Sequence, residues 1–206
     1  MAFGDHWEWR GFGHTSASFQ AWFLQLSPLA PSPENRLHDE YLWTPGCIHN
    51  VKLRYDALKF KRFLAREGQF ERWLEAEKDF LPFPLSPTHL QQLELLLNVS
   101  LPPAPTHSID RDAFLHLIAQ AHPRIHRISV VKQRRLHRWS LQSGEELIVE
   151  WTHILQPEPV ETVALECQNL SSLRHAFALL RSKLKAMRPM NYVTALSKWV
   201  VYSETE

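Results

Sequence analysis

The chain has 206 residues, a net charge of +1, 44% hydrophobic residues and eight tryptophans. This composition is typical of a globular protein, and the length is ample for one domain with its own hydrophobic core. Proteins that bind nucleic acid or an anionic membrane usually carry a clear basic excess, so the charge balance argues against both partners.

Two local features bear on the compartment. Cys47 and Cys167 are too few for a disulfide framework. The first residues lack a basic segment followed by an apolar run, and no apolar stretch approaches the roughly 18 residues of a membrane span. We therefore expect a cytoplasmic protein without a membrane segment.

Hydrophobic periodicity predicts a mixture of helices and strands. In chain order, the patterns predict a strand at 6–12, a helix at 16–26, strands at 40–43, 51–54 and 58–64, helices at 69–80, 88–97 and 108–121, strands at 126–139, 146–155 and 161–167, and helices at 172–185 and 191–200. The alternation is too irregular for a doubly wound parallel sheet, and no GxGxxG or GxxxxGK loop is present. We predict an α+β fold in which helices pack outside an antiparallel sheet or barrel, as one domain over 1–206 with a mostly helical middle at about 63–127.

The segment NVKLRYDALKFKR, residues 50–62, concentrates four cations in two short strands. Strand alternation puts Lys52 and Arg54 on one face, and it puts Lys59 and Lys61 on one face of the next strand. With an even loop, Arg54 would lie across from Lys59 and Lys52 across from Lys61, so that all four share a face. Water could solvate that face, as in any half-exposed hairpin, or an anion could bind there.

Charged residues at strand parity recur elsewhere in the sequence. Lys132 and Arg134 share a face of the predicted strand at 126–139, while Glu8, Glu150 and Glu166 stand on three other strands. Each glutamate alone could face solvent or join an ion pair. Together, such strands suit a barrel with a polar lumen, in which cations grip phosphates and carboxylates hold a divalent metal.

The order of these segments resembles the CYTH domain, the triphosphate tunnel metalloenzyme superfamily that includes class IV adenylate cyclases and thiamine triphosphatases. The resemblance covers residues 5–10, 40–62, 128–138 and about 145–200, where HWEWR, VKLR, LKFK and KQRR stand in the family's order. It implies a closed antiparallel barrel whose lumen binds a triphosphate through cations and magnesium or manganese through glutamates.

Carried over position by position, the resemblance assigns roles to particular residues. Glu8 and Lys59 would act in catalysis, and Mg²⁺ or Mn²⁺ would be held by Glu8, Glu150 and Glu166. The phosphate-binding residues would be Arg10, Lys52, Arg54, Lys59, Lys61, Lys132 and Arg134.

The sequence departs from the family pattern at three positions. His6 stands where the family has a carboxylate, Arg10 where it has lysine, and Ala164 where it has another carboxylate. A metal that needs several oxygen ligands finds fewer of them here, so the cationic side matches the family better than the metal side.

Three functions remain open on the sequence. The first is metal-dependent hydrolysis of a triphosphate or short polyphosphate, the second is a non-catalytic module that binds polyphosphate or a nucleotide, and the third is nucleic-acid binding through basic strands and tryptophans. The resemblance to the CYTH domain places the first slightly ahead of the second, and the near-neutral net charge argues against the third.

Overall fold

The computed structural model describes residues 4–29, 36–76, 79–102, 106–121 and 124–203. Strands and helices alternate irregularly along the chain. Their bounds are β1 (Asp5–Gly13), α1 (Ala17–Phe23), β2 (Ser27–Pro28), β3 (Arg36–Trp43), β4 (Asn50–Arg54), β5 (Ala57–Glu67), β6 (Phe70–Leu74), β7 (Phe80–Pro82), α2 (Pro87–Leu97), α3 (Arg111–Gln120), β8 (His126–Ser140), β9 (Glu146–Gln156), β10 (Val160–Cys167), α4 (Leu170–Leu180), β11 (Met187–Pro189) and α5 (Tyr192–Ser203).

Eight of the described strands close into an antiparallel barrel. Around the barrel they run β1, β6, β5, β4, β3, β8, β9 and β10, and β10 pairs again with β1. The short strands β2, β7 and β11 pair with β8, β5 and β1 outside this ring. The predicted antiparallel barrel is confirmed, and it is the architecture that the resemblance to the CYTH domain implies.

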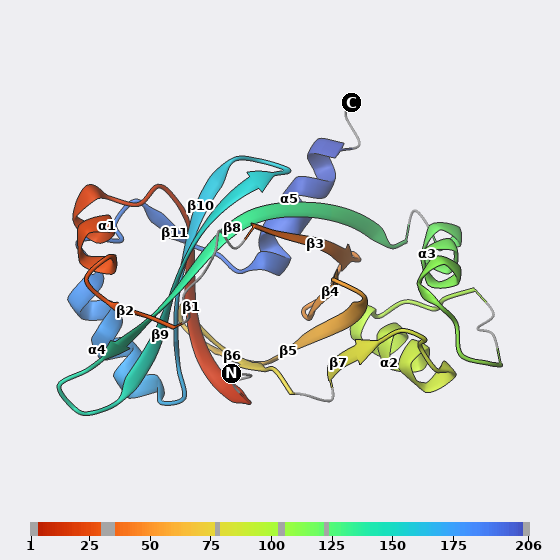
Figure 1. Ribbon diagram of the computed structural model, residues 1–206, viewed down its shortest axis with the longest axis horizontal. Helices are drawn as coiled ribbons and strands as arrows, with labels where there is room; N and C mark the ends of the chain where they lie inside the picture. The colour runs from red at the N-terminus through yellow and green to blue at the C-terminus, as the bar shows by residue number, and fades with distance from the viewer. Residues whose placement is uncertain (1–3, 30–35, 77–78, 103–105, 122–123, 204–206) are drawn as a thin grey trace.

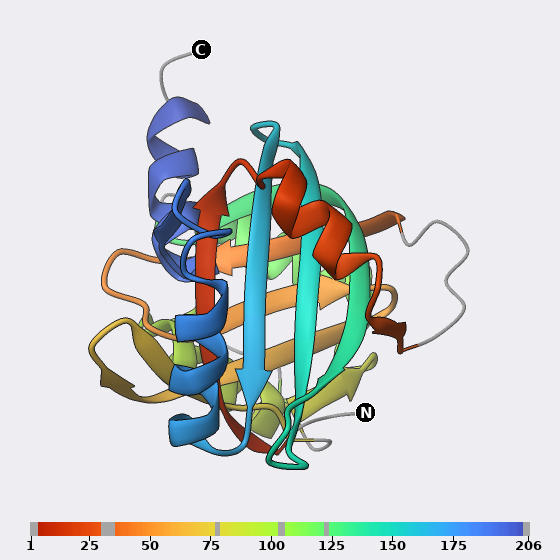
Figure 2. The same cartoon turned by 90° about the vertical axis from the view of Figure 1, so that its left-hand side faces the viewer.

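Helices cover the outside of the barrel on two opposite sides (Figure 1). Helices α1 and α4 lie over the face formed by β1, β10 and β9, which Figure 2 shows from the front. Helices α2 and α3 pack against β4 and β5 through a second apolar cluster that includes Val51, Leu58 and Phe60. None of the helices in the described part of the chain has the length and apolar character needed to cross a bilayer.

Helix α5 covers one end of the barrel interior. Its residues Leu196 and Trp199 pack against Phe12, Tyr41 and Ile154, which lie at inward-facing positions of three strands. This apolar contact closes that end of the lumen, so the charged residues of the strands lie in the remaining part.

The charged hairpin forms with a register that differs from the prediction. The loop consists of Tyr55 and Asp56, so Lys52 lies directly opposite Lys59, and Arg54 opposite Ala57. Tyr55 accommodates the tight turn with a φ of 54°. The shift is by an even number of residues, which preserves the face of every side chain.

The segment 69–80 was predicted as a helix, and that prediction is wrong. Residues 70–74 form the strand β6, which pairs with β5 and β1 and is needed to complete the ring. Phe70, Trp73 and Leu74 fit helical spacing, but Phe70 and Trp73 are buried against different parts of the barrel wall. The middle segment 63–127 therefore contains the end of β5 and the strands β6 and β7 in addition to α2 and α3.

Candidate functional site

A cavity of about 340 Å³ lies inside the barrel and is lined by alternate residues of its strands. Every residue that the sequence analysis assigned to a site lines this cavity. Seven lining residues are cations and four are carboxylates: Arg10, Lys52, Arg54, Lys59, Lys61, Lys132 and Arg134, with Glu8, Glu75, Glu150 and Glu166. The hairpin cations therefore face the lumen, and water on the outer surface does not explain them.

Three of the cations surround one buried carboxylate, and we call this group of Asp39, Lys52, Arg54 and Lys132 the Asp39 cluster. Arg54 donates to both oxygens of Asp39 at 2.6 Å. The ammonium of Lys132 lies 2.9 Å and that of Lys52 3.3 Å from the same carboxylate. Burial disfavours a charge on Asp39, but Lys52 and Arg54 hold its pKa well below the usual range. One carboxylate thus serves three cations.

The lysines of the Asp39 cluster are held in a strongly cationic environment. Burial, with the nearby charge of Arg54, lowers the pKa of Lys132 to about 8. The same two causes lower the pKa of Lys52 well below its usual value. An anion that enters the cluster would relieve both effects, because it adds the negative charge that the cluster lacks.

Glu75 links two further cations of the cavity. Lys59 donates to Glu75 at 2.7 Å, and Lys61 lies 3.4 Å from the same carboxylate while it also donates to Glu8. Burial disfavours the charge on Glu75, but the two lysines hold its pKa well below the usual range. The acidic group therefore fixes the positions of cations that come from β5.

On the other side of the cavity, one guanidinium lies among three carboxylates, and we call Arg10, Glu8, Glu150 and Glu166 the Arg10 cluster. Arg10 Nε donates to Glu8 and Nη1 donates to Glu150, both at 2.7 Å. Its Nη2 lies 3.9 Å from Glu166. The guanidinium also lies over the ring of Tyr192, 5.0 Å from the ring centre. Every nitrogen of Arg10 therefore faces a carboxylate.

Strand register explains how Arg10 reaches Glu150. Arg10 lies opposite Ala164, and Ala164 in turn lies opposite Glu150 on the next strand. The small side chain of Ala164 leaves the space between them to the arginine. Two of the departures from the family pattern, Arg10 and Ala164, thus belong to one arrangement.

The carboxylates of the Arg10 cluster have very different pKa values. Burial disfavours the charge on Glu8, but Arg10 and Lys61 outweigh it and lower its pKa to about 2. In the same way, Arg10 and Arg134 hold the pKa of Glu150 well below its usual range. Burial and the neighbouring carboxylates instead raise the pKa of Glu166 to about 7, although Lys61 opposes the shift. Near neutral pH, a proton rather than a cation neutralises much of the Glu166 charge.

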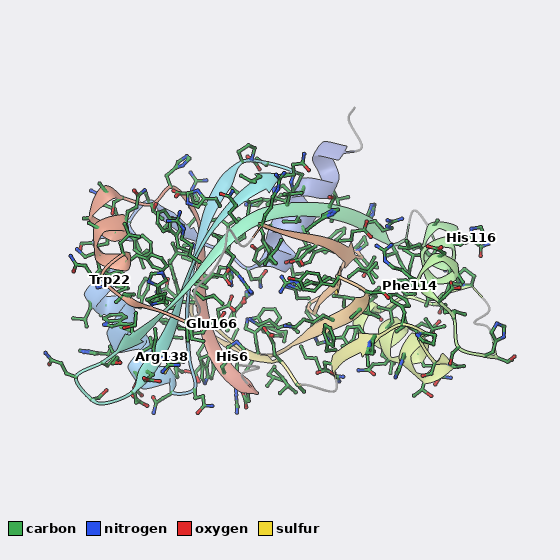
Figure 3. The ribbon with its side chains drawn as sticks, in the orientation of Figure 1. His6, Trp22, Phe114, His116, Arg138 and Glu166 are labelled. Carbon is green, nitrogen blue, oxygen red and sulfur yellow. The ribbon has the colours of Figure 1, made fainter. Side chains whose placement is uncertain are left out.

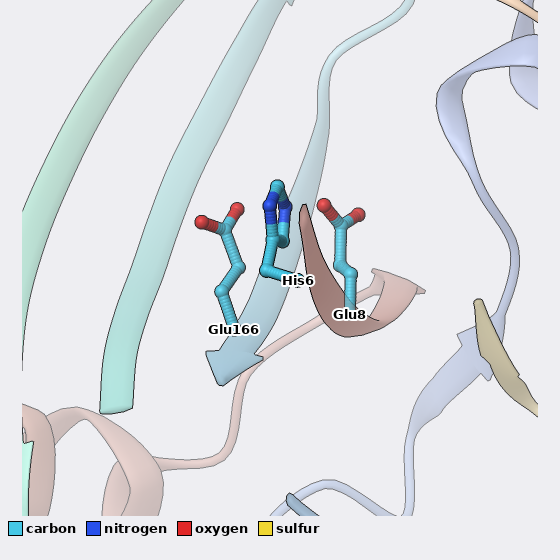
Figure 4. Close-up of side chains that lie close together, drawn as sticks. All are labelled: His6, Glu8 and Glu166. Atoms are coloured by element: carbon cyan, nitrogen blue, oxygen red, sulfur yellow. The ribbon is translucent and has the colours of Figure 1, made fainter. Parts of the chain in front are cut away.

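Potential metal ligands come together at one point of this region. One ligand atom each of His6, Glu8 and Glu166 lies within 4.8 Å of the others, and Figure 4 shows the three side chains next to one another. Figure 3 places His6 and Glu166 on the strands between the two groups of outer helices. Burial, with the charge of Lys61, lowers the pKa of His6 to about 4, so its ring is neutral at physiological pH. Its Nδ1 donates to the carbonyl of Gly4, so Nε2 carries the lone pair.

The predicted metal ligands Glu8, Glu150 and Glu166 fit a divalent ion poorly, because cations already occupy two of them. Both oxygens of Glu8 accept from cations, one from Arg10 and the other from Lys61. Glu150 is paired with Arg10 and lies 3.8 Å from Arg134. Of the three predicted metal ligands, Glu166 alone has no cation closer than 3.9 Å among the described residues. A magnesium or manganese ion would have to displace Arg10 before it could use all three.

A second cavity of about 350 Å³ meets the first at this cluster. It lies between the β5–β6 hairpin and the start of α5, with Arg66, Glu71 and Thr194 in its lining. Glu8 and Arg10 line both cavities. The Arg10 cluster therefore forms part of the common wall between them.

Two acidic residues of the site were missed in the sequence analysis. Asp39 precedes the predicted strand at 40–43 and has the same parity as Tyr41, which would have placed it in the lumen had the strand been extended. Glu75 was not assigned to the lumen because residues 69–80 were predicted to form a helix, to which strand parity does not apply. Both could have been sought on physical grounds, since cations that face one another across strands require counter-charges.

Comparisons with known proteins place the chain among remote structural neighbours. No protein-family model and no curated protein matches it. Among solved structures, a putative adenylyl cyclase from Hippeastrum, described as having a dominant triphosphatase activity, is 12% identical with a TM-score of 0.49, over 90% of this chain and 91% of that one. A Pyrococcus horikoshii protein is 10% identical over 94% and 98% of the two chains, with a TM-score of 0.48. A putative adenylate cyclase from Bacillus halodurans is 13% identical over 92% and 96%, with a TM-score of 0.46. The fold of this chain is established by its own strand order and register.

Proposed function

We propose that the protein binds a triphosphate, a short polyphosphate or the phosphate tail of a nucleotide inside the barrel. The observation that carries the proposal is the convergence of seven cations from four strands on one cavity. Such a concentration of lysine and arginine in a chain of net charge +1 supports a local anion site. The cavity volume falls within the range of small-molecule sites.

The accessible cations indicate where the anion would bind first. The side chains of Lys59 and Arg134 are 28% and 27% exposed, more than those of the other lining cations. The buried Nε of Arg134 has no hydrogen-bond partner among the described residues. Lys52 and Lys132 lie deeper, so a chain of phosphates would meet Lys59 and Arg134 before it reached the Asp39 cluster.

Binding is better supported than metal-dependent hydrolysis. Hydrolysis was expected to use Glu8 with a metal and Lys59 at the transferred phosphate. Because Arg10 and Lys61 already neutralise Glu8, this carboxylate is poorly placed to hold a metal. Lys59 keeps its proposed role as a phosphate ligand.

Calorimetric titration with inorganic triphosphate tests the proposal. We expect Lys52→Ala and Lys59→Ala each to weaken binding roughly tenfold or more, because each loses a charge-assisted hydrogen bond. Arg127→Ala is the matched control, since Arg127 pairs with Glu40 on the outer face of the barrel. Normal binding by both lysine variants would refute the proposed site.

A second assay separates binding from turnover. Release of phosphate from triphosphate and from ATP is measured with Mg²⁺ or Mn²⁺ in the wild type and in Glu8→Gln. We expect no metal-dependent release by the wild type. Release that depends on the metal and is lost in Glu8→Gln would establish the hydrolase instead.

A further inference from the structure

The position of Arg10 carries a consequence for ion specificity. Its guanidinium lies at the point where Glu8, Glu150 and Glu166 converge from three neighbouring strands, β1, β9 and β10. Arg10 Nη1 also donates to the Thr162 hydroxyl at 3.3 Å. The ring of Tyr192 covers the guanidinium. A cation that is held on its edge and on its face has a fixed place in the lumen.

The carboxylates of the Arg10 cluster are already neutralised in large part by positive charges of the protein. Arginine remains protonated at every physiological pH, so its charge is permanent. Lys61 supplies a second positive charge to Glu8. A divalent ion placed among the same carboxylates would be repelled by two cations within a few ångströms, and it would have to break the two 2.7 Å contacts of Arg10.

We propose that Arg10 is a resident cation that takes the place of a divalent metal, so that the cavity binds phosphate without metal and removal of the Arg10 charge turns its carboxylates into a metal site. The inference extends the proposed function to its ion requirement. Whether Arg10 keeps a metal ion out does not depend on whether the cavity binds phosphate, so the two statements are tested separately.

Titration with Mn²⁺ alone, followed by calorimetry and by the loss of the free-ion electron paramagnetic resonance signal, tests the inference. Arg10→Gln removes the charge but keeps a polar side chain of moderate length. We expect Arg10→Gln to bind Mn²⁺ at least tenfold more tightly than the wild type, because three carboxylates lose their common cation. Wild-type protein that binds Mn²⁺ as tightly as Arg10→Gln would overturn the inference.

Arg134→Gln is the matched control. Arg134 lines the same cavity and lies 3.8 Å from Glu150, but the described structure shows no ion pair between it and Glu8 or Glu166. We expect its Mn²⁺ affinity to stay within about threefold of the wild type. A gain equal to that of Arg10→Gln would show that any loss of positive charge in the lumen suffices, and it would overturn the special role of Arg10.

Thermal unfolding keeps the inference testable if Arg10→Gln is unstable. We expect Mn²⁺ to raise the Tm of Arg10→Gln by several degrees relative to EDTA and to leave the wild type unchanged, because only the variant has an open metal site. If Arg10→Gln does not fold with Mn²⁺ or with EDTA, measurements on the wild-type protein test the inference. Triphosphate binding in EDTA without measurable Mn²⁺ binding supports the inference, and tight Mn²⁺ binding refutes it.

The proposed function can fail without the inference failing. Wild-type protein that binds no triphosphate in EDTA or with metal would refute phosphate binding. A gain of Mn²⁺ affinity in Arg10→Gln would then still establish Arg10 as the resident cation of the cluster.

Discussion

The two charged clusters of the lumen are built in opposite ways. In the Asp39 cluster, three cations share one fully buried carboxylate, whereas in the Arg10 cluster three carboxylates share one guanidinium. The first leaves a surplus of positive charge and the second a surplus of negative charge. A charged residue in a barrel lumen therefore cannot be assigned to a ligand until its partners within the protein are known.

The difference also separates the two halves of the expected chemistry. The surplus of the Asp39 cluster suits an anion, so the predicted phosphate-binding side is supported. Lys61 and protonation of Glu166 reduce the surplus of negative charge in the Arg10 cluster. The cluster therefore does not support the predicted metal-binding side. The proposed function follows from this asymmetry.

Removal of the central carboxylate should have the largest effect on stability. Asp39→Asn leaves three buried cations without their common partner, so we expect a loss of about 3–5 kcal/mol in the free energy of unfolding. Triphosphate should restore part of it, because the ligand supplies the missing negative charge. Thermal unfolding with and without triphosphate measures both effects.

Asp79→Asn is the control for that experiment. Asp79 is buried and paired with Arg62, and neither residue lines the cavity. We expect this variant to lose stability without gaining from triphosphate beyond the wild type. Equal gains in the two variants would show that the Asp39 cluster is not the anion site.

The Arg10 cluster should respond to neutralisation with opposite signs at two of its glutamates. The pKa of Glu166 is raised to about 7, so its charge destabilises the fold at pH 8, and Glu166→Gln should stabilise it by about 2 kcal/mol. This corresponds to a Tm increase of about 4–8 °C. The gain should vanish near pH 4, where the carboxyl is protonated in the folded and the unfolded chain.

Glu150→Gln should destabilise the protein by about 2 kcal/mol at pH 8, because Arg10 and Arg134 hold the pKa of Glu150 well below its usual range. Denaturant unfolding of both variants at pH 4 and pH 8 measures the difference. The same sign for both variants at pH 8 would contradict the described division of charge within the cluster.

The smallest expected effect concerns the pH dependence of triphosphate binding. The pKa of Lys132 is lowered to about 8, so the Asp39 cluster loses one positive charge as the pH rises from 7 to 9. We expect the wild-type affinity to fall about fivefold over this range relative to Lys132→Arg, which stays charged. The ligand's own ionisation is common to both proteins and cancels in the ratio. Parallel pH profiles would show that Lys132 does not contact the ligand.

Strand alternation predicted an antiparallel sheet or barrel and the direction of its charged side chains, and the resemblance to the CYTH domain implied that the sheet closes. The parity of Lys52, Arg54, Lys59 and Lys61 survives the register shift, because moving the turn by an even number of residues leaves each side chain on its face. The turn itself was misplaced, since sequence periodicity does not identify the residue that adopts a positive φ, here Tyr55.

The counter-charges and the missing strand could not be predicted in the same way. Helical spacing is matched by Phe70, Trp73 and Leu74. Their segment is nevertheless a strand, because it pairs with β5 and β1. The contact between Arg10 and Glu150 depends on the order of strands β1, β10 and β9, which no local pattern specifies. The strand at 70–74 and the contact between Arg10 and Glu150 thus depend on tertiary strand pairing, which local periodicity does not specify.

Glu8 and Arg10 form part of the wall that the main cavity shares with the second cavity. If the proposed ligand is a linear polyphosphate that enters beside Lys59, its leading end would meet Arg10 at this wall. Affinity would then stop rising with chain length once the terminus reaches the guanidinium.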